Sequence, residues 1–419
     1  MLMGACNPTV CPLHVVRHMS DYPGLSENFT FGSSGPDSSE HLALYRWACA
    51  AVLDAANVTG VGNVAALLVT HCAEVVARLV LPLVDQTDDN GGRGALMVYD
   101  AVPLTIAHRS PGWTYGFYPL GVLDPDKHLA TLEATLDLWG RKNNDLIPKA
   151  VDPLTQFDQR DDLYYAGMVP LNALAGRGDA AYGNITEFLG TATVATGCLP
   201  IGTHCPPCDR AIGLDRRWNH CITPTAMYLE TNNPVFEGPM MVANGLQEML
   251  LFGSMGGTTM RPGRTLIKVF PAVPTGWTDA VFHHLLAEGA FLVSARRKAG
   301  LLEFFSITAR GSRTDLEIRV GDMRGPKLCV QTAAIDAATS RVPPRRRQAA
   351  LAWARGHLGV IVGTVPLGTT VTVHAVDNGT SCTDHAQFNS TEFLPGDPSE
   401  FNHYGYRARL IPTGQQDFQ

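Results

Sequence analysis

The sequence predicts a helical region followed by a β region, and three observations indicate this order. In the first half, apolar residues recur at helical spacing, as in segments 40–56 and 63–81. From about Thr265 onward they form short runs between turn residues, at the spacing of sandwich strands. Between the two regions, the stretch from Asn232 to Ala295 changes from the first period to the second. We therefore expect a mainly α fold that passes into an antiparallel β-sandwich.

The first two helical segments are expected to pair as a hairpin, because each has one apolar face. The face of 40–56 consists of Leu42, Tyr45, Cys49, Val52, Leu53 and Ala56. The face of 63–81 consists of Val64, Leu67, Leu68, His71, Val75 and Leu79. We interpret His71 and Cys72 as core residues and not as ligands.

Three later signals set expected helix boundaries. Asp124-Pro125 predicts a helix start, with Asp as the N-cap and Pro in the first turn. A helix over 160–177 contains Pro170, which predicts a kink. Gly178-Asp179 then predicts a stop and a new start.

One carboxylate, Glu237, is expected at a helix N-terminus at the junction of the two regions. It lies in a Gly/Pro turn, and Pro239 suits the first turn of a helix. Apolar residues follow at helical spacing until the glycines from Gly253 onward, where we expect the helix to end. The helix dipole favours the ionised carboxylate there, which suits a general base.

The junction resembles the C-terminal end of the catalytic domain in glycoside hydrolase family 95, the α-L-fucosidases. The matching elements are a Glu-x-Pro turn, a Gln-Glu-Met-Leu-Leu helix and two strands. They read Glu237 to Pro239, Gln247 to Leu251, Ile267 to Pro274 and Glu288 to Ala295. The resemblance implies a partial (α/α)6 toroid of helical hairpins before the sandwich. The expected divisions are an irregular segment 1–39, a toroid-like domain 40–262, a sandwich 263–377 and an irregular tail 378–419.

The resemblance also implies an inverting mechanism, in which one carboxylic acid protonates the leaving oxygen and a base activates water. Glu237 corresponds to the base. The acid corresponds to Glu27, in the Ser26-Glu27 loop before the Arg46-Trp47 helix. The alternatives are that Glu27 is a solvated loop glutamate, or that the matching carboxylate is Glu40 in the first turn of the helix. An inverting pair predicts carboxyl groups about 6.5–9.5 Å apart.

A second cluster, His108, Arg109 and Trp113, is expected to bind substrate. The family carries three histidines in this run, and here the second and third are Ser110 and Trp113. His and Arg donors beside aromatic faces suit sugar hydroxyls and C–H groups. A loop that only supports the helices is the alternative interpretation.

Composition narrows the class of protein. The net charge of −7 argues against nucleic acid as a partner, and no apolar run has transmembrane length. The 10 cysteines suggest a secreted protein although no signal peptide is visible at the start. The Asn-x-Ser/Thr sequons agree with secretion, and they lie at Asn28, Asn57, Asn184, Asn378 and Asn389.

Residues 190–225 look like an insertion relative to the family. Its Cys198, Cys205, Cys208 and Cys221 indicate a disulfide-stapled loop, with a zinc knuckle as the alternative. Arg345 to Arg347 form a basic loop, which we interpret as solvated. We expect no cofactor and no metal.

Two functions are therefore open: a glycoside hydrolase acting on α-L-fucosyl or related linkages, and a catalytically inactive relative that binds glycans or acts as a scaffold. The helical segments are fewer than a closed toroid needs. The Asn pair that holds the family's catalytic water has no counterpart that we can identify. We therefore expect that the chain is incomplete at its N-terminus and does not hydrolyse fucosides at an enzymatic rate.

Overall fold

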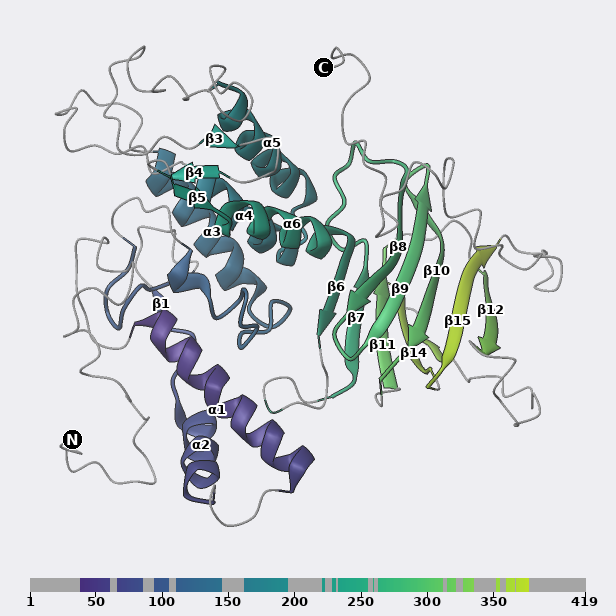
Figure 1. The fold of residues 1–419 in the computed structure, drawn as a ribbon, viewed down its shortest axis with the longest axis horizontal. Coiled ribbons are helices and arrows are strands. Elements are labelled where there is room, and N and C mark those ends of the chain that lie inside the picture. The colour runs from purple at the N-terminus through teal and green to yellow at the C-terminus, as the bar shows by residue number, and fades with distance from the viewer. Residues whose placement is uncertain are drawn as a thin grey trace.

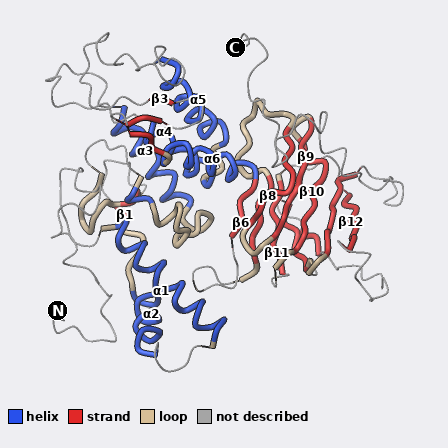
Figure 2. Tube along the Cα trace, in the orientation of Figure 1, coloured by secondary structure: helices blue, strands red, loops and turns tan. Residues whose placement is uncertain are grey.

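Along the described chain, six α-helices come first and two five-stranded β-sheets follow (Figure 1). The structure is a computed structural model that describes residues 38–60, 66–85, 94–104, 111–144, 162–194, 221–222, 228–230, 233–254, 259, 263–311, 315–321, 327–334, 352–354, 359–365 and 367–376. The expected order of helices before sheets is confirmed, and the two regions are separate in Figure 2. Within the described ranges, no helix is both long and apolar enough to cross a bilayer.

Helices α1 (Ser39–Thr59) and α2 (Ala66–Arg78) pack against each other and project below the other helices in Figure 1. The predicted face of α1 is confirmed for all its residues except Ala56, which is not part of the hairpin core. The prediction for α2 is only half right, because Leu67 is 88% exposed and Leu68 is 50% exposed. The later turns of α2 make the contact instead. The hairpin core consists of Leu42, Cys49, Cys72, Val75, Leu79 and Leu83. His71 is exposed and hydrogen-bonds the Tyr45 hydroxyl, so our placement of His71 in the core is wrong.

Helices α3 (Leu129–Asn144), α4 (Asp162–Leu174) and α5 (Gly178–Val194) form the rest of the helical region before the junction. The 3-10 turn η4 (Gly112–Thr114) joins α3 and α4 in an aromatic core around Trp113, Trp139 and Tyr164. Pro170 lies inside α4, as expected.

The predicted helix start at Asp124 is wrong, because α3 begins at Leu129. The Asp124 carboxylate accepts a hydrogen bond from the backbone N–H of Asp126. The backbone carbonyl oxygen of Asp124 accepts a hydrogen bond from the N–H of His128. Asp side chains readily stabilise turns through such hydrogen bonds. Here the turn precedes the helix, and Asp124 does not act as its N-cap.

Helix α6 (Glu237–Leu250) is followed directly by strand β6 (Leu251–Ser254). We expected the helix to continue to Gly253. It stops earlier because β6 pairs with β7 (Thr265–Val269), starting at Leu251 opposite Val269. The change from helix to sheet therefore comes at Leu251, before the expected position near 263.

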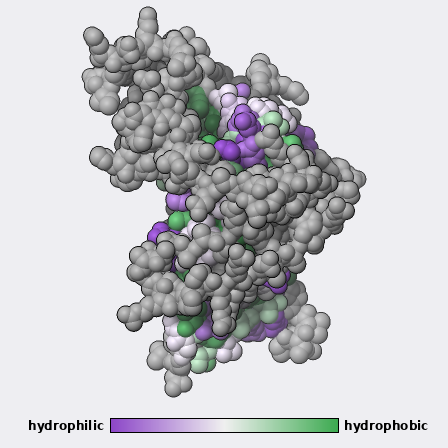
Figure 3. All heavy atoms as spheres, turned by 90° about the vertical axis from the view of Figure 1, so that its right-hand side faces the viewer, coloured by the Kyte–Doolittle hydropathy of each residue, from purple (hydrophilic) through white to green (hydrophobic). Residues whose placement is uncertain are grey.

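The two sheets pack face to face around one apolar core. One sheet has the order β6, β7, β11 (Asp315–Val320), β14 (Gly359–Thr364) and β13 (Ala352–Ala354). The other has the order β8 (Ala280–Ala287), β9 (Phe291–Lys298), β10 (Leu301–Ala309), β15 (Thr369–Val376) and β12 (Lys327–Ala334). Both sheets contribute to the core, including Ile267 and Ile318 from one, and Val293 and Phe305 from the other. Seen from the sandwich side, the described surface has hydrophilic and hydrophobic residues interspersed (Figure 3).

All strands predicted from 265 onward are present, and β6 and β13 are additional. One correction concerns direction: β7 and β11 pair in parallel, although the sandwich was expected to be antiparallel. Between these strands the chain crosses to the other sheet and builds β8 to β10, so β11 returns in the same direction as β7. The turn between β9 and β10 has positive φ at Ala299 and Gly300.

Short strands complete the described helical region. Strands β1 (Val84–Asp85) and β2 (Ala95–Leu96) pair with each other, and Leu96 donates its N–H to Thr135 of α3. Strands β3 (Cys221–Ile222), β4 (Tyr228–Glu230) and β5 (Asn233–Val235) form a three-stranded sheet that leads into α6.

The helical region docks on the sandwich through the segment 271–277, which follows β7. Ala272 packs in a core with Val169 of α4, Ala181 of α5 and Met249 of α6. Asp179 of α5 accepts hydrogen bonds from the backbone N–H and hydroxyl of Thr275. Gly178 lies so close to Ala272 that an added Cβ would be 2.4 Å from the Ala272 carbonyl oxygen.

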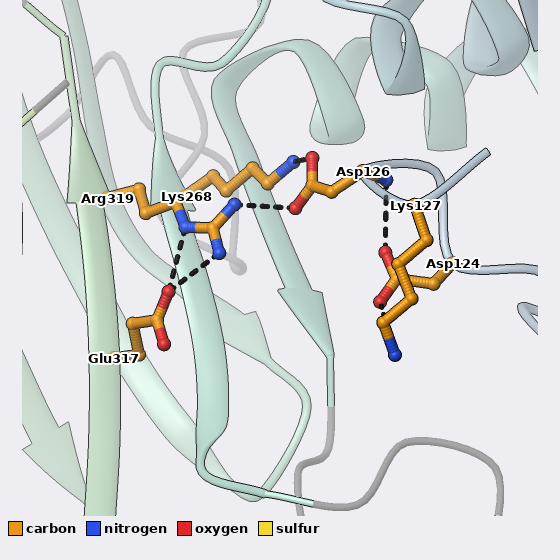
Figure 4. Close-up of polar contacts among 6 residues, drawn as sticks. All are labelled: Asp124, Asp126, Lys127, Lys268, Glu317 and Arg319. Atoms are coloured by element: carbon orange, nitrogen blue, oxygen red, sulfur yellow. Dashed lines mark hydrogen bonds and ion pairs between the residues drawn. The ribbon is translucent and has the colours of Figure 1, made fainter. Parts of the chain in front are cut away.

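A group of charged side chains makes a second connection between the regions (Figure 4). Asp126, just before α3, contacts Lys268 of β7 at 2.5 Å and Arg319 of β11 at 2.6 Å. Arg319 also pairs with Glu317 at 2.7 Å. Burial acts to raise the pKa of Asp126, but the hydrogen bonds and charges of Lys268 and Arg319 outweigh it, so the pKa is lowered.

The lowered pKa predicts that acid weakens this connection. A carboxylate with a depressed folded-state pKa stabilises the fold above its unfolded pKa of about 3.9 and loses that contribution as the pH falls through the folded value. The Asp126 side chain is 35% exposed, so we expect only about 1 kcal/mol from the contact. Asp126→Asn should therefore lower the melting temperature slightly at pH 7 and leave it nearly unchanged at pH 2. Equal losses at both pH values would contradict the prediction.

Candidate functional site

Glu237 is the first residue of α6, as predicted, and its side chain is exposed. Phe236 precedes it and provides no side-chain cap to the helix. In the described part of the chain, the Glu237 carboxylate has no hydrogen-bond or ion-pair partner. The helix dipole therefore acts on an ionisable group that is open to solvent and to a ligand.

Glu237 shares one side of α6 with Asn244 and Glu248. The three positions are separated by seven and four residues, so they lie within about 40° of one another around the helix. Met241 belongs to the same side. This side lies next to the buried one, where Gly245 and Met249 face α4 and its neighbours. The arrangement forms a polar stripe (Glu237, Asn244 and Glu248) that begins at the helix N-terminus.

Tyr118 meets this stripe from the segment between η4 and α3. Burial raises the pKa of its hydroxyl to about 12; the hydrogen bond with Asn244 lowers that pKa and the nearby charge of Glu248 raises it. The hydroxyl is therefore neutral at physiological pH. It holds α6 and the segment after η4 together by a polar contact beside the helix face that carries Glu237.

Helix α6 is also fixed by close packing at Gly245. A Cβ added there would lie 2.4 Å from Cγ1 of Val169 and 2.9 Å from the backbone nitrogen of Pro170. Glycine thus allows the backbones of α4 and α6 to approach closely. This contact sets the position of the helix that starts with Glu237.

Of the other expected site residues, Glu27, His108 and Arg109 lie outside the described residues. The structure therefore does not test whether these three residues lie near Glu237. The expected distance between the Glu27 and Glu237 carboxyl groups stays a prediction. Tyr118 is the described residue that follows this run and reaches α6.

Trp113 is described, and it lies inside the protein. It is 1% exposed, and its ring packs edge-on against Trp139 with centroids 6.2 Å apart. Thr114 and Phe117 beside it are also buried. A sugar would have to displace this packing to stack on Trp113, so its place in the structure favours a packing role over the substrate-binding role that we expected.

Sequence reasoning did not assign the contact of Tyr118 with Asn244 and Glu248. The helical spacing of Glu237, Asn244 and Glu248 was visible in the sequence and could have indicated the polar stripe. The contact of Tyr118 with the polar stripe depends on how the segment after η4 folds back onto α6. No local sequence pattern indicates that fold.

Metal ligation finds no support among the described residues, where no group of three or more His, Cys, Asp or Glu side chains converges. Most of the cysteine-rich insertion lies outside the described residues, so its disulfide and zinc alternatives stay open. Cys329 of β12 is disulfide-bonded. Comparison with models of known protein families and with curated proteins gave no match.

Proposed function

We propose that this chain is a glycoside hydrolase-like protein that binds an α-L-fucosyl or related glycan beside the N-terminus of α6. The carrying observation is the exposed Glu237 carboxylate, which begins α6 and has no partner among the described residues. Glu237 supplies the base function, and Glu27 is the proposed acid. The partial (α/α)6 arrangement of the helices belongs to the same proposal.

The chemistry of the site supports this assignment in two ways. The helix dipole favours negative charge at the N-terminus, which suits a base that activates water. The polar stripe adds an amide and a second carboxylate, and such groups accept and donate hydrogen bonds to sugar hydroxyls. His108 and Arg109 are the proposed further contacts to substrate.

The alternative is a catalytically inactive relative that binds glycans or acts as a scaffold. The burial of Trp113 favours this alternative. Trp113 stands at one of the two positions where the family carries a further histidine, and its side chain is part of the core. Ser110 stands at the other altered position, where the family carries an imidazole that helps to fix the sugar. A secreted location is proposed for both functions, in agreement with the disulfide at Cys329.

Binding and hydrolysis of an α-1,2-fucosyl oligosaccharide test the proposal. We expect the wild-type chain to bind it and Glu237→Gln to bind about tenfold more weakly, because a hydrogen bond to a charged acceptor contributes about 1.5–3 kcal/mol. We expect release of L-fucose to stay below enzymatic rates, because the helices of the described residues are too few for a closed toroid and we identify no counterpart of the water-holding Asn pair in the sequence. Titration calorimetry and a coupled L-fucose assay give the two measurements.

Glu187→Gln is the matched control, because Glu187 is an exposed carboxylate within α5 instead of at a helix start. It should bind as the wild type does. Robust turnover that disappears only in Glu237→Gln would establish a complete enzyme and refute the expectation of slow hydrolysis. Absence of binding in all three proteins would refute the proposed function.

A further inference from the structure

The α1–α2 hairpin has two cysteines at its centre. Cys49 of α1 is 3% exposed and Cys72 of α2 is 2% exposed. Both belong to the hairpin core, and the side chains of the two residues hydrogen-bond each other. Both are thiols in this structure.

The hairpin core is small and is distinct from the aromatic core around Trp139, although Leu81 packs against both. Large apolar side chains near its far end are exposed, with Val58 at 84% and Leu67 at 88%. Small cores supply limited stabilisation, and a covalent cross-link is a common supplement. Cys329 is disulfide-bonded, so oxidation of cysteine already occurs in this protein.

From this placement we propose that Cys49 and Cys72 form a disulfide that joins α1 to α2. The oxidant is a disulfide of low-molecular-weight or protein type. One cysteine thiolate attacks it, forming a mixed disulfide and releasing one thiol. The second cysteine thiolate then attacks the mixed disulfide and releases the other thiol. Two cysteines are oxidised, one external disulfide is reduced to two thiols, and the two cysteine protons end on those thiols.

Burial, together with the hydrogen bond and charge of Cys72, raises the pKa of Cys49 to about 12. Exchange requires the thiolate, so the closed hairpin reacts slowly. The bond therefore forms while the hairpin folds or opens locally. Once formed, it lies between buried apolar side chains, where an external thiol reaches it only after the same opening.

Peptide mapping tests the proposal. The full chain is folded in a buffer of reduced and oxidised glutathione, denatured without reductant, and treated with a thiol-blocking reagent. Digestion and mass spectrometry then identify the cross-links, and a sample in which Cys329 is fully oxidised shows that disulfides have formed. We expect a linked peptide that contains Cys49 and Cys72. Blocking of both thiols in such a sample, or pairing of either with a different cysteine, would overturn the proposal.

Hydrogen exchange provides a second test. Because the wild type and the double variant both keep the Cys329 disulfide, comparing them separates its reduction from that of the proposed bond. Reductant should raise the exchange rate of α1 and α2 amides by on the order of tenfold or more in the wild type. The double variant Cys49→Ala/Cys72→Ala should show no such change, because it lacks the proposed bond. An equal effect of reductant on both proteins would contradict a cross-link between these helices.

Discussion

Gly178→Ala is expected to destabilise the protein strongly, because it places a methyl group against the backbone of the sandwich. The new Cβ would lie 2.4 Å from the carbonyl oxygen of Ala272 and 2.7 Å from the carbonyl carbon of Val273. These neighbours are backbone atoms of the docking segment 271–277, which Asp179 holds through Thr275. Such a clash cannot be relieved by rotating a side chain. We expect a loss of about 3 kcal/mol, at the upper end of the usual range for overpacking.

Thermal unfolding of the full chain and hydrogen exchange of α5 and segment 271–277 measure this effect. The control is Gly183→Ala on the same helix, where an added Cβ meets nothing within 4 Å. That change should stabilise the protein by about 0.5–1 kcal/mol, because alanine favours the helix over glycine. If both variants were stabilised alike, the close contact of α5 with the sandwich would be wrong.

Gly245→Ala is expected to have the second largest effect, and it links stability to the candidate site. Its Cβ would lie 2.4 Å from Cγ1 of Val169, whose side chain is fully buried. Helix α6 would have to move away from α4 and would carry Glu237 with it. We expect a net loss of about 2 kcal/mol after the gain in helix propensity, and weaker glycan binding.

A double-mutant cycle with Val169→Ala measures this contact directly. Removing Cγ1 should make the loss caused by Gly245→Ala smaller by about 1 kcal/mol. Part of the loss should persist, because Cβ of Val169 and the nitrogen of Pro170 each lie 2.9 Å from the added carbon. Strictly additive effects of the two changes would show that α4 and α6 do not meet at these residues.

Glycan binding and melting temperature, measured together, distinguish the roles of Glu237 and Gly245. Loss of glycan binding in Glu237→Gln, with unchanged melting temperature, would support a direct role of the carboxylate. Loss of binding in Gly245→Ala would instead accompany a loss of stability. Comparison of the two variants therefore separates a ligand contact from the position of the helix that carries it.

The local features of this protein follow from its amino-acid sequence alone. Period and turn chemistry were sufficient for the helical pattern at Leu42 and Cys49, the start of α6 at Glu237, and the strands from Thr265 onward. These features depend on residues close together in the chain, such as the positive-φ turn at Ala299 and Gly300.

Which face of each helix or strand packs against a neighbour depends instead on the tertiary structure. Leu67 and Trp113 are both large and apolar, yet Leu67 is exposed while Trp113 is buried. The contact of Tyr118 with Asn244, and that of Asp126 with Lys268, join residues more than a hundred positions apart. No local propensity encodes such pairs, because they depend on how whole elements pack. The parallel pairing of β7 with β11 likewise follows from the path of the chain through the other sheet, which the pattern of either strand leaves open.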